Sequence, residues 1–304
     1  MNKIKNVLLI GLGAIGSIYA EKLASSSDVN LKILLDEKRF EKYSNSDFFI
    51  NDKKLDLQYV RPQDDDFKAD LIIISVKYPE FLNSIKLIRN FVGENTIIVS
   101  LLNGISTEKI LAENYGAKNI VYSYFIGHSS VRKLNRVYFD GVGKLVIGPY
   151  NNNLDLVEKL QQFFCENEIQ SEISDDILFD LWKKFAINVG INQTSAICSA
   201  NYGEIKKSKY IRNIVKNLIS EVEMLAEKNE IKNPQKFTEA TFSLIDDAPD
   251  ENITSMLQDI EAKRETEVEL FAGEVIKQAE KFKIHVPYNQ MAYDLIKYKT
   301  FKKK

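Results

Sequence analysis

The sequence has few of the residues that would mark an exported, metal-binding or disordered protein. Its 304 residues include two cysteines, Cys165 and Cys198, and neither has a second Cys or a His at metal-ligand spacing. A disulfide framework and a zinc site are therefore excluded, and a reducing, cytoplasmic environment fits best. Only 13 glycines and 6 prolines accompany 44% hydrophobic residues, a composition typical of a well-packed globular protein.

The sequence also lacks an excess of one charge and a long hydrophobic run. Lys and Arg number 41 against 43 Asp and Glu, a net charge of -2, which leaves no basic surplus for sequence-independent binding of nucleic acid. No stretch approaches the ~18 consecutive apolar residues of a membrane helix, and the apolar run at residues 7–10 is too short for a signal peptide. Nucleic acid and membrane partners are not expected, and a homodimer is left open.

Two patterns of secondary structure divide the chain. Short apolar runs alternate with helical stretches in the first half, at residues 7–10, 31–35, 71–76, 96–102 and 120–125. This alternation predicts parallel strands that are buried on both faces and joined by crossover helices. Residues 136–148 alternate apolar and polar side chains around Asp140 and Gly141, which predicts an antiparallel hairpin that closes the sheet. Residues 169–173 predict one more edge strand.

From residue 176 onward the pattern is helical. Helices are expected at residues 177–200, 211–228, 235–243, 253–282 and 288–298. Because the chain is longer than the roughly 100 to 200 residues of one typical domain, we expect two domains. These are an α/β domain over residues 1–175 and an all-α domain over residues 176–304.

A glycine-rich turn directly follows the first expected strand and opens a helix. It consists of Gly11, Leu12, Gly13, Ala14, Ile15 and Gly16. The glycines allow a tight turn at Gly11, close approach of a pyrophosphate at Gly13 and helix-on-strand packing at Gly16. The N-terminus of the helix supplies unpaired amides for the anion. In this strand–turn–helix setting, the motif predicts that the first domain is a Rossmann-type dinucleotide-binding domain.

Charged residues at the end of the second expected strand bear on the choice of dinucleotide. Asp36 stands 20 residues after Gly16, where a carboxylate would bind the ribose 2'-hydroxyl of NADH and repel the 2'-phosphate of NADPH. Lys38 and Arg39 follow at once, and cations there could hold that phosphate. These residues leave the choice open, and a plain charged loop is an equally good interpretation of them.

Lys77 and Asn103 end the expected strands at residues 71–76 and 96–102. In an open α/β sheet, ligands bind beyond the carboxyl ends of the strands. Both side chains are therefore expected to border the cofactor cleft, although polar residues that merely end buried strands would look the same.

Lys184, Asn188 and Asn192 form a polar stripe on the helix expected at residues 177–200, because their spacing is i, i+4, i+8. A ketone reductase needs a proton donor for the carbonyl oxygen that becomes negative as hydride arrives. The two histidines, His128 and His285, are interpreted as surface residues. Lys184 is then the better acid, provided that its pKa falls from about 10.4 toward ~7 to 8.

Together these features resemble the ketopantoate reductase (2-dehydropantoate 2-reductase) family over nearly the whole chain. The resemblance rests on GLGAIG at residues 11–16, SVK at 75–77, LLNGI at 101–105, KFAINVGIN at 184–192 and SMLQDIEAKRETEVE at 255–269. It implies an NADPH-dependent reduction of 2-dehydropantoate to pantoate, a step of pantothenate and coenzyme A biosynthesis. An NADH-dependent reductase of another 2-keto acid and a nonenzymatic NAD(P)-binding sensor are the alternatives.

The resemblance also implies roles for individual residues. Lys184 would be the proton donor, and Glu267 would partner the lysine, the nicotinamide ribose or the substrate hydroxyl. The substrate-binding residues would be Asn103, Asn188, Asn192, Asn252 and Ser255. The cofactor-binding residues would be Gly11, Leu12, Gly13, Ala14, Ile15, Gly16, Asp36, Arg39, Lys77, Asn103 and Glu267.

This chain departs from the family pattern at three positions. Gln193 follows the stripe where the family often has proline, and Asp36 stands where the family often has arginine. Asn201 is displaced by one residue from a substrate-binding Asn that some members carry before Gly-Glu.

The expected helix at residues 253–282 also poses a geometric problem. A straight helix would separate Ser255 from Glu267 by about 12 × 1.5 Å, or ~18 Å, too far for one six-carbon keto acid to span. We therefore expect residues 252–255 either to fold back over the substrate or to reach it on domain closure. A role for Asn252 or Ser255 as a helix N-cap is the structural alternative.

Overall fold

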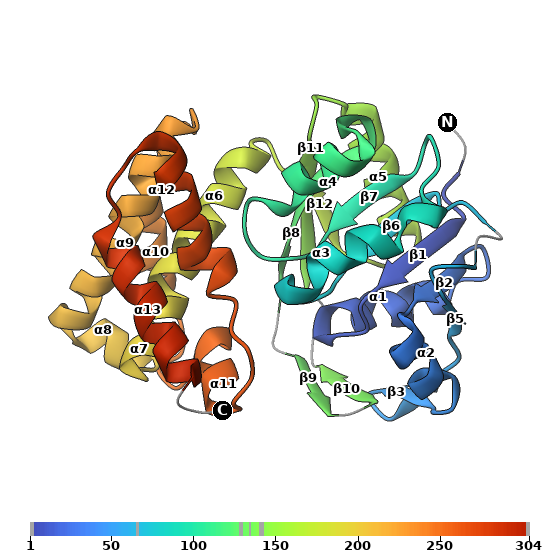
Figure 1. The fold of residues 1–304 in the computed structure, drawn as a ribbon, viewed down its shortest axis with the longest axis horizontal. Helices are drawn as coiled ribbons and strands as arrows, with labels where there is room; N and C mark the ends of the chain where they lie inside the picture. Colours follow the sequence, from blue (N-terminus) through green and yellow to red (C-terminus); the bar gives the residue numbers. More distant parts are fainter. Residues whose placement is uncertain (1–2, 65–66, 128–129, 134, 140–142, 302–304) are drawn as a thin grey trace. The chain divides into compact units, whose positions relative to one another are not determined.

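The structure is a computed structural model that describes the chain apart from residues 1–2, 65–66, 128–129, 134, 140–142 and 302–304. The chain divides into two compact units, Met1–Ile177 and Leu178–Lys304, which Figure 1 colours from blue to green and from yellow to red. The first is α/β, and the regular elements described in the second are all helices. The predicted fold class is confirmed. Within the described residues, no helix has both the length and the apolar character needed to span a bilayer.

An eight-stranded sheet in the order β12-β11-β8-β7-β6-β1-β2-β5 forms the centre of the first unit. Its strands are β1 (Asn6–Ile10), β2 (Asn30–Leu34), β5 (Gln58–Val60), β6 (Leu71–Ile74), β7 (Ile97–Ser100), β8 (Ile120–Ile126), β11 (Lys144–Pro149) and β12 (Ser171–Ile173). Neighbouring strands are parallel except for β8 and β11. The strands expected from the first half of the sequence are all present.

Alternate residues of the strands pack into two separate layers. Val7 and Leu9 of β1 belong to one buried cluster, and Leu8 and Ile10 to the other, because successive side chains of a strand point to opposite faces. The first cluster includes side chains of α1 (Ala14–Ala24), α2 (Glu37–Ser44) and α5 (Leu154–Glu166). The second includes side chains of α3 (Tyr78–Leu87), η1 (Arg89–Phe91) and α4 (Thr107–Tyr115), which precedes the short η2 (Ala117–Asn119). Both faces of the sheet are therefore covered.

The hairpin predicted over residues 136–148 is wrong. Its first half, β10 (Arg136–Phe139), joins a separate sheet in the order β4-β3-β10-β9, with β3 (Phe48–Ile50), β4 (Lys53–Leu55) and β9 (Ser130–Lys133). Its second half, β11, pairs with β8 and β12 instead. Leu145, Val146 and Ile147 are consecutive buried residues, which is the pattern of a strand covered on both faces. Asp140 and Gly141 lie outside the described residues.

The second unit is built around the long helix α9. Val215, Leu218, Ile219, Val222 and Leu225 are buried along one face of it, at the spacing of an amphipathic helix. This helix packs against η3, α7, α8, α10, α12 and α13. The elements of the unit are α6 (Ile177–Ile187), η3 (Asn188–Asn192), α7 (Gln193–Cys198), α8 (Tyr202–Lys207), α9 (Lys209–Lys228), α10 (Lys236–Asp247), α11 (Ser255–Glu261), η4 (Glu269–Gly273), α12 (Glu274–Phe282) and α13 (Pro287–Phe301).

Two of the expected long helices are interrupted. Residues 177–198 are helical, but η3 within them is a π-helix, and the expected helix at residues 253–282 breaks after Glu261. Lys263 adopts a left-handed conformation, and Arg264 folds back to bond Asp259 through both its backbone N–H and its guanidinium, at 2.8 and 2.6 Å. The continuous helix is therefore a wrong prediction, and the ~18 Å rise between Ser255 and Glu267 does not apply.

Candidate active site

The predicted cofactor-binding residues of the first unit lie along one edge of the sheet. The glycine turn follows β1, Asp36 follows β2, Lys77 follows β6 and Asn103 lies beyond β7. These four strands are neighbours in the order β7-β6-β1-β2 and run parallel, so their carboxyl ends meet at the same edge. Lys77 is exposed at the start of α3, and Asn103 is partly buried.

The three glycines of the turn differ in what a side chain would meet. A Cβ on Gly11 would collide with the carbonyl oxygen of Ser75, and a Cβ on Gly16 with that of Gly11. A Cβ on Gly13 would approach nothing closer than the Ser75 oxygen at 3.8 Å. Gly13 is also the N-cap of α1 and offers no side-chain cap. Gly13 therefore has space for a ligand at a helix N-terminus that no side chain of the N-cap covers, which fits the pyrophosphate of a dinucleotide.

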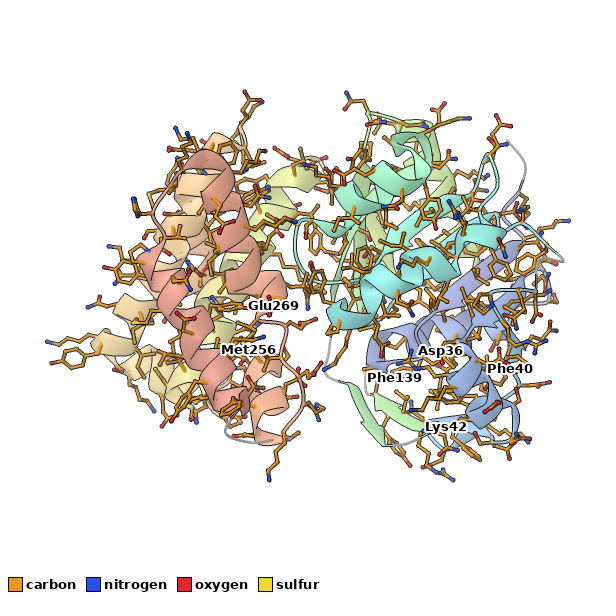
Figure 2. The ribbon with its side chains drawn as sticks, in the orientation of Figure 1. Asp36, Phe40, Lys42, Phe139, Met256 and Glu269 are labelled. Atoms are coloured by element: carbon orange, nitrogen blue, oxygen red, sulfur yellow. The ribbon has the colours of Figure 1, made fainter. Side chains whose placement is uncertain are left out.

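Asp36 lies at the junction of β2 and α2, where Figure 2 labels it. It is the N-cap of α2, and its Oδ1 accepts the backbone N–H of Arg39 at 2.8 Å. Its Oδ2 pairs with the Arg39 guanidinium at 3.0 Å. The same guanidinium pairs with Glu80 at the beginning of α3. Arg39 is thus held between two carboxylates.

Lys184, Asn188 and Asn192, the predicted polar stripe, follow one another along α6 and the π-helix η3. Lys184 lies in the last turn of α6, and Asn188 and Asn192 are the first and last residues of η3. The Nδ2 of Asn192 donates to the Oδ1 of Asn188 at 3.2 Å, so the two amides lie side by side. All three residues are partly buried. A single π-turn within a helix occurs frequently at functional sites.

The electrostatics of Lys184 are those of a lysine suited to proton transfer. Burial lowers its pKa from 10.5 to about 8, and the nearby carboxylate of Glu267 opposes this by raising it. The pKa of the Lys184 ammonium therefore lies close to neutral pH, where a general acid works best. Of the two histidines, His285 is exposed and His128 lies outside the described residues.

A buried amide, Gln193, connects the two π-helical segments. Its side chain is fully buried, its Nε2 donates to the Val189 carbonyl of η3 at 2.9 Å, and its Oε1 accepts the backbone N–H of Ala272 in η4 at 3.1 Å. Glu267 stands two residues before η4. One side chain therefore ties the segment that carries the two asparagines to the segment that follows Glu267.

The network continues from Gln193 into the core of the unit. Its Nε2 also donates to Asn289 at 3.1 Å, and the Nδ2 of Asn289 donates to Glu221 and to the Leu218 carbonyl at 2.8 and 3.1 Å. Glu221 further accepts the backbone N–H groups of Tyr288 and Asn289 at the start of α13. A buried carboxylate and two amides with this many partners fix the relative positions of α9, α13, η3 and η4.

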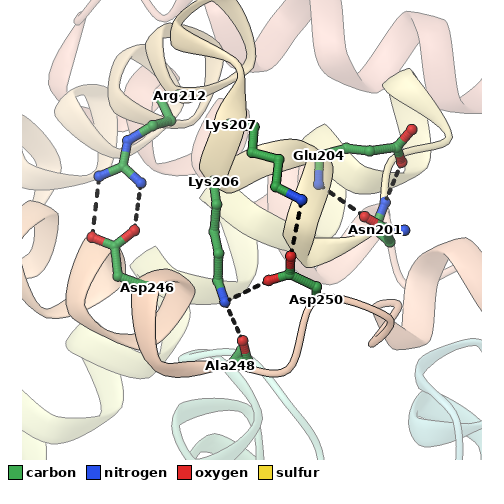
Figure 3. Close-up of polar contacts among 8 residues, drawn as sticks. All are labelled: Asn201, Glu204, Lys206, Lys207, Arg212, Asp246, Ala248 and Asp250. Atoms are coloured by element: carbon green, nitrogen blue, oxygen red, sulfur yellow. Dashed lines mark hydrogen bonds and ion pairs between the residues drawn. The ribbon is translucent and has the colours of Figure 1, made fainter.

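Asn252 and Ser255 are both exposed, on a segment that is fastened to α8. The backbone N–H of Tyr202 donates to the Asn252 carbonyl at 3.0 Å. Figure 3 shows the ion pairs nearby, in which Asp250 holds Lys206 and Lys207 at 2.9 and 3.1 Å. The helix that begins at Ser255, α11, packs against η3. The segment with both residues is therefore held beside the asparagine stripe.

The capping alternative for Asn252 and Ser255 is wrong, because the N-cap of α11 is Thr254, whose hydroxyl accepts the Leu257 N–H at 3.3 Å. Asn201 caps α8 instead, in a capping box with Glu204 that Figure 3 shows. The Asn201 Oδ1 accepts the Glu204 N–H and the Glu204 carboxylate accepts the Asn201 N–H, both at 2.9 Å. This capping role accounts for the displaced Asn201.

Replacement of Gly16 by alanine should lower the stability of the protein, whereas replacement of Gly13 by alanine should weaken dinucleotide binding. Gly16→Ala forces a Cβ against the Gly11 carbonyl, so the thermal midpoint should fall with a loss of about 1–3 kcal/mol or more. Gly13→Ala should keep the midpoint and lose affinity for a nicotinamide dinucleotide. Differential scanning fluorimetry and a binding titration measure the two effects. A midpoint for Gly13→Ala as low as that for Gly16→Ala would contradict this assignment.

Replacement of Gln193 by leucine should destabilise the second unit strongly. The change leaves the Ala272 N–H and the Val189 carbonyl without this partner in the core, and each unsatisfied buried group costs about 1–3 kcal/mol. Gln290→Leu on the exposed face of α13 is the matched control. Urea unfolding followed by circular dichroism compares the two. Equal midpoints for both variants would show that the network carries no stability.

Comparison with known proteins connects this geometry to one family. Residues 7–152 match the family Ketopantoate reductase PanE/ApbA, and residues 176–300 match its C-terminal domain, Ketopantoate reductase PanE/ApbA C terminal. The 2-dehydropantoate 2-reductase of Aquifex aeolicus is 24% identical, over 97% of this chain and 97% of its own.

Solved structures share the fold at low identity. D-mandelate dehydrogenase in complex with NADH superposes with a TM-score of 0.87 at 20% identity, over 98% of this chain and 100% of its own. A dimeric ketopantoate reductase from Staphylococcus aureus superposes with a TM-score of 0.78 at 21% identity, over 98% and 100%. With both family regions matched along most of its length, the chain belongs to the ketopantoate reductase family.

Proposed function

We propose that the protein reduces 2-dehydropantoate to pantoate with a reduced nicotinamide dinucleotide, in the cytoplasm, as a step of pantothenate and coenzyme A biosynthesis. The observation that carries the proposal is Lys184, whose pKa burial lowers to about 8 while Glu267 counteracts the shift. It stands at the head of a paired asparagine stripe. Family membership and the glycine turn with space at Gly13 support the same reaction.

Lys184 acts as the proton donor in this proposal. When bound, the reduced nicotinamide supplies a hydride to the carbonyl carbon of the keto acid. Negative charge then develops on the carbonyl oxygen, and the ammonium of Lys184 stabilises it and transfers one proton to it. The products are the 2-hydroxy acid, the oxidised dinucleotide and a neutral lysine amine. Glu267 keeps the lysine protonated at neutral pH, because its charge raises the pKa that burial lowers.

The remaining site residues orient the substrate. The paired amides of Asn188 and Asn192 offer donors and acceptors for the keto acid's oxygens. Asn252 and Ser255 are assigned to the substrate carboxylate, and their exposure leaves them accessible to a ligand. Asn103, at the edge of the sheet, is assigned to both cofactor and substrate. A sensor that only binds NAD(P) needs neither a tuned lysine nor a carboxylate beside it.

Replacement of Lys184 by alanine should lower kcat by about 10²-fold or more, the usual scale for loss of a general acid. Affinity for the dinucleotide should stay within a few fold. Lys183→Ala is the matched control, because Lys183 pairs with Asp180 at 2.6 Å and lies outside the stripe. A steady-state assay with a panel of branched 2-keto acids identifies the substrate at the same time. Loss of dinucleotide affinity with kcat intact would overturn the assignment, and no turnover of any keto acid would favour the sensor.

The pH dependence of reduction should follow the charge of Lys184. Because the ammonium is the active form, kcat/KM should fall as pH rises through about 8. Glu267→Gln removes the charge that raises this pKa, so the falling limb should move to lower pH. Glu265→Gln, a change of an exposed carboxylate in the same loop, is the control. A rate that climbs steadily to high pH, or a limb that Glu267→Gln does not move, would contradict the role of the pair.

A further inference from the structure

We infer that the protein selects NADH over NADPH, because the two guanidinium groups beside the end of β2, those of Arg39 and Arg61, are already held by carboxylates. This inference rests on the proposed function in one respect, namely that a nicotinamide dinucleotide binds at the carboxyl edge of the sheet. It is opposite to the NADPH dependence that the family resemblance implies. It assigns a specificity role to Glu80, a residue that the sequence patterns did not single out.

Asp36 keeps its carboxylate at the place where a Rossmann-type domain binds the adenosine ribose. It lies two residues after the end of β2, and the Arg39 N–H fixes its Oδ1 at 2.8 Å. A carboxylate has about four lone-pair sites, so the two bonds to Arg39 leave acceptor capacity for ribose hydroxyls. The 2'- and 3'-hydroxyls of NADH would donate to these sites, whereas a 2'-phosphate would meet a fixed negative charge.

Arg39 is the natural candidate for a phosphate ligand, but it is engaged on both sides. One nitrogen of its guanidinium pairs with Asp36 at 3.0 Å, and another pairs with Glu80 from α3. A 2'-phosphate would have to compete with both carboxylates for the guanidinium. If the phosphate displaced them, the two carboxylates would be left unpaired beside it. Arg39 therefore offers NADPH little net attraction.

A second guanidinium near this edge is held in the same way. Arg61 directly follows β5, the strand next to β2. It pairs with Glu37 at 3.6 Å and with Asp64 at 3.4 Å, and its backbone N–H donates to Asp64 at 2.9 Å. Two lysines near this edge, Lys38 and Lys77, are exposed.

Each of the two guanidinium groups at this edge faces two carboxylates before any ligand binds. Asp36 and Glu80 pair with Arg39, and Glu37 and Asp64 pair with Arg61. A phosphate monoester adds about -1.5 to -2 charges at neutral pH. Placing this charge beside carboxylates that already hold the guanidinium groups is unfavourable, whereas the neutral ribose hydroxyls of NADH find acceptors there.

Binding of the two dinucleotides without any keto acid tests the inference directly. Titrations of the unmodified protein with NADH and with NADPH, followed by cofactor fluorescence or calorimetry, give the two dissociation constants. We expect NADH to bind at least about tenfold more tightly, which corresponds to about 1.4 kcal/mol. Tighter binding of NADPH than of NADH would overturn the inference.

Two charge-removing variants test the mechanism of selection. Asp36→Asn keeps a good N-cap for α2 while it removes the charge, and Glu80→Gln removes a partner of Arg39. The double variant should bind NADPH at least about tenfold more tightly than the unmodified protein does. Glu41→Gln is the matched control, because it removes one exposed carboxylate from the same helix. An NADPH affinity in the double variant no better than in the control would overturn the inference.

The binding measurement separates this inference from the proposed function. Tight NADH binding without turnover of any 2-keto acid would remove the proposed reaction and leave the cofactor selection standing. Binding of neither dinucleotide would overturn both. Turnover with NADH and not with NADPH would support both.

Discussion

The hydrogen bonds of the buried Gln193 side-chain amide are the interaction on which the geometry of the second unit depends. The amide accepts from η4, donates to η3 and to Asn289, and through Asn289 reaches the Glu221 carboxylate of α9. Two π-helical segments leave backbone groups that regular α-helices would pair internally. A single amide with a donor and an acceptor end satisfies one such group in each, and so fixes the stripe in register with the segment after Glu267.

The sequence predicts the strands and helices in which apolar or polar side chains recur at one regular spacing. The parallel strands around Leu71–Ile74 consist of residues buried on both faces, and their short apolar runs identify them directly. The stripe from Lys184 is readable for the same reason. The helix breaks cannot be predicted in this way, because they depend on individual side-chain contacts and not on a repeating pattern. The turn after Glu261 depends on a side-chain bond from Arg264 back to Asp259, and propensity alone favours one long helix there.

The candidate site is only partly predictable for a related reason. Residue types that perform chemistry, such as Lys184 and Glu267, stand out by spacing and resemblance. Gln193 was visible only as a departure from proline, and its role depends on Ala272 and Asn289, which lie 79 and 96 residues further along the chain. Glu80 likewise becomes meaningful only when α3 places it against Arg39.

The central claim is that the fold tunes Lys184 into an acid for work near neutral pH, and its titration in the unliganded protein is the most direct test. Nuclear magnetic resonance of the lysine side chains, with Lys184→Arg to assign the signal, follows its protonation without any substrate or cofactor. The account predicts a midpoint at about 8. A midpoint at the ordinary lysine value of 10.5 would contradict it.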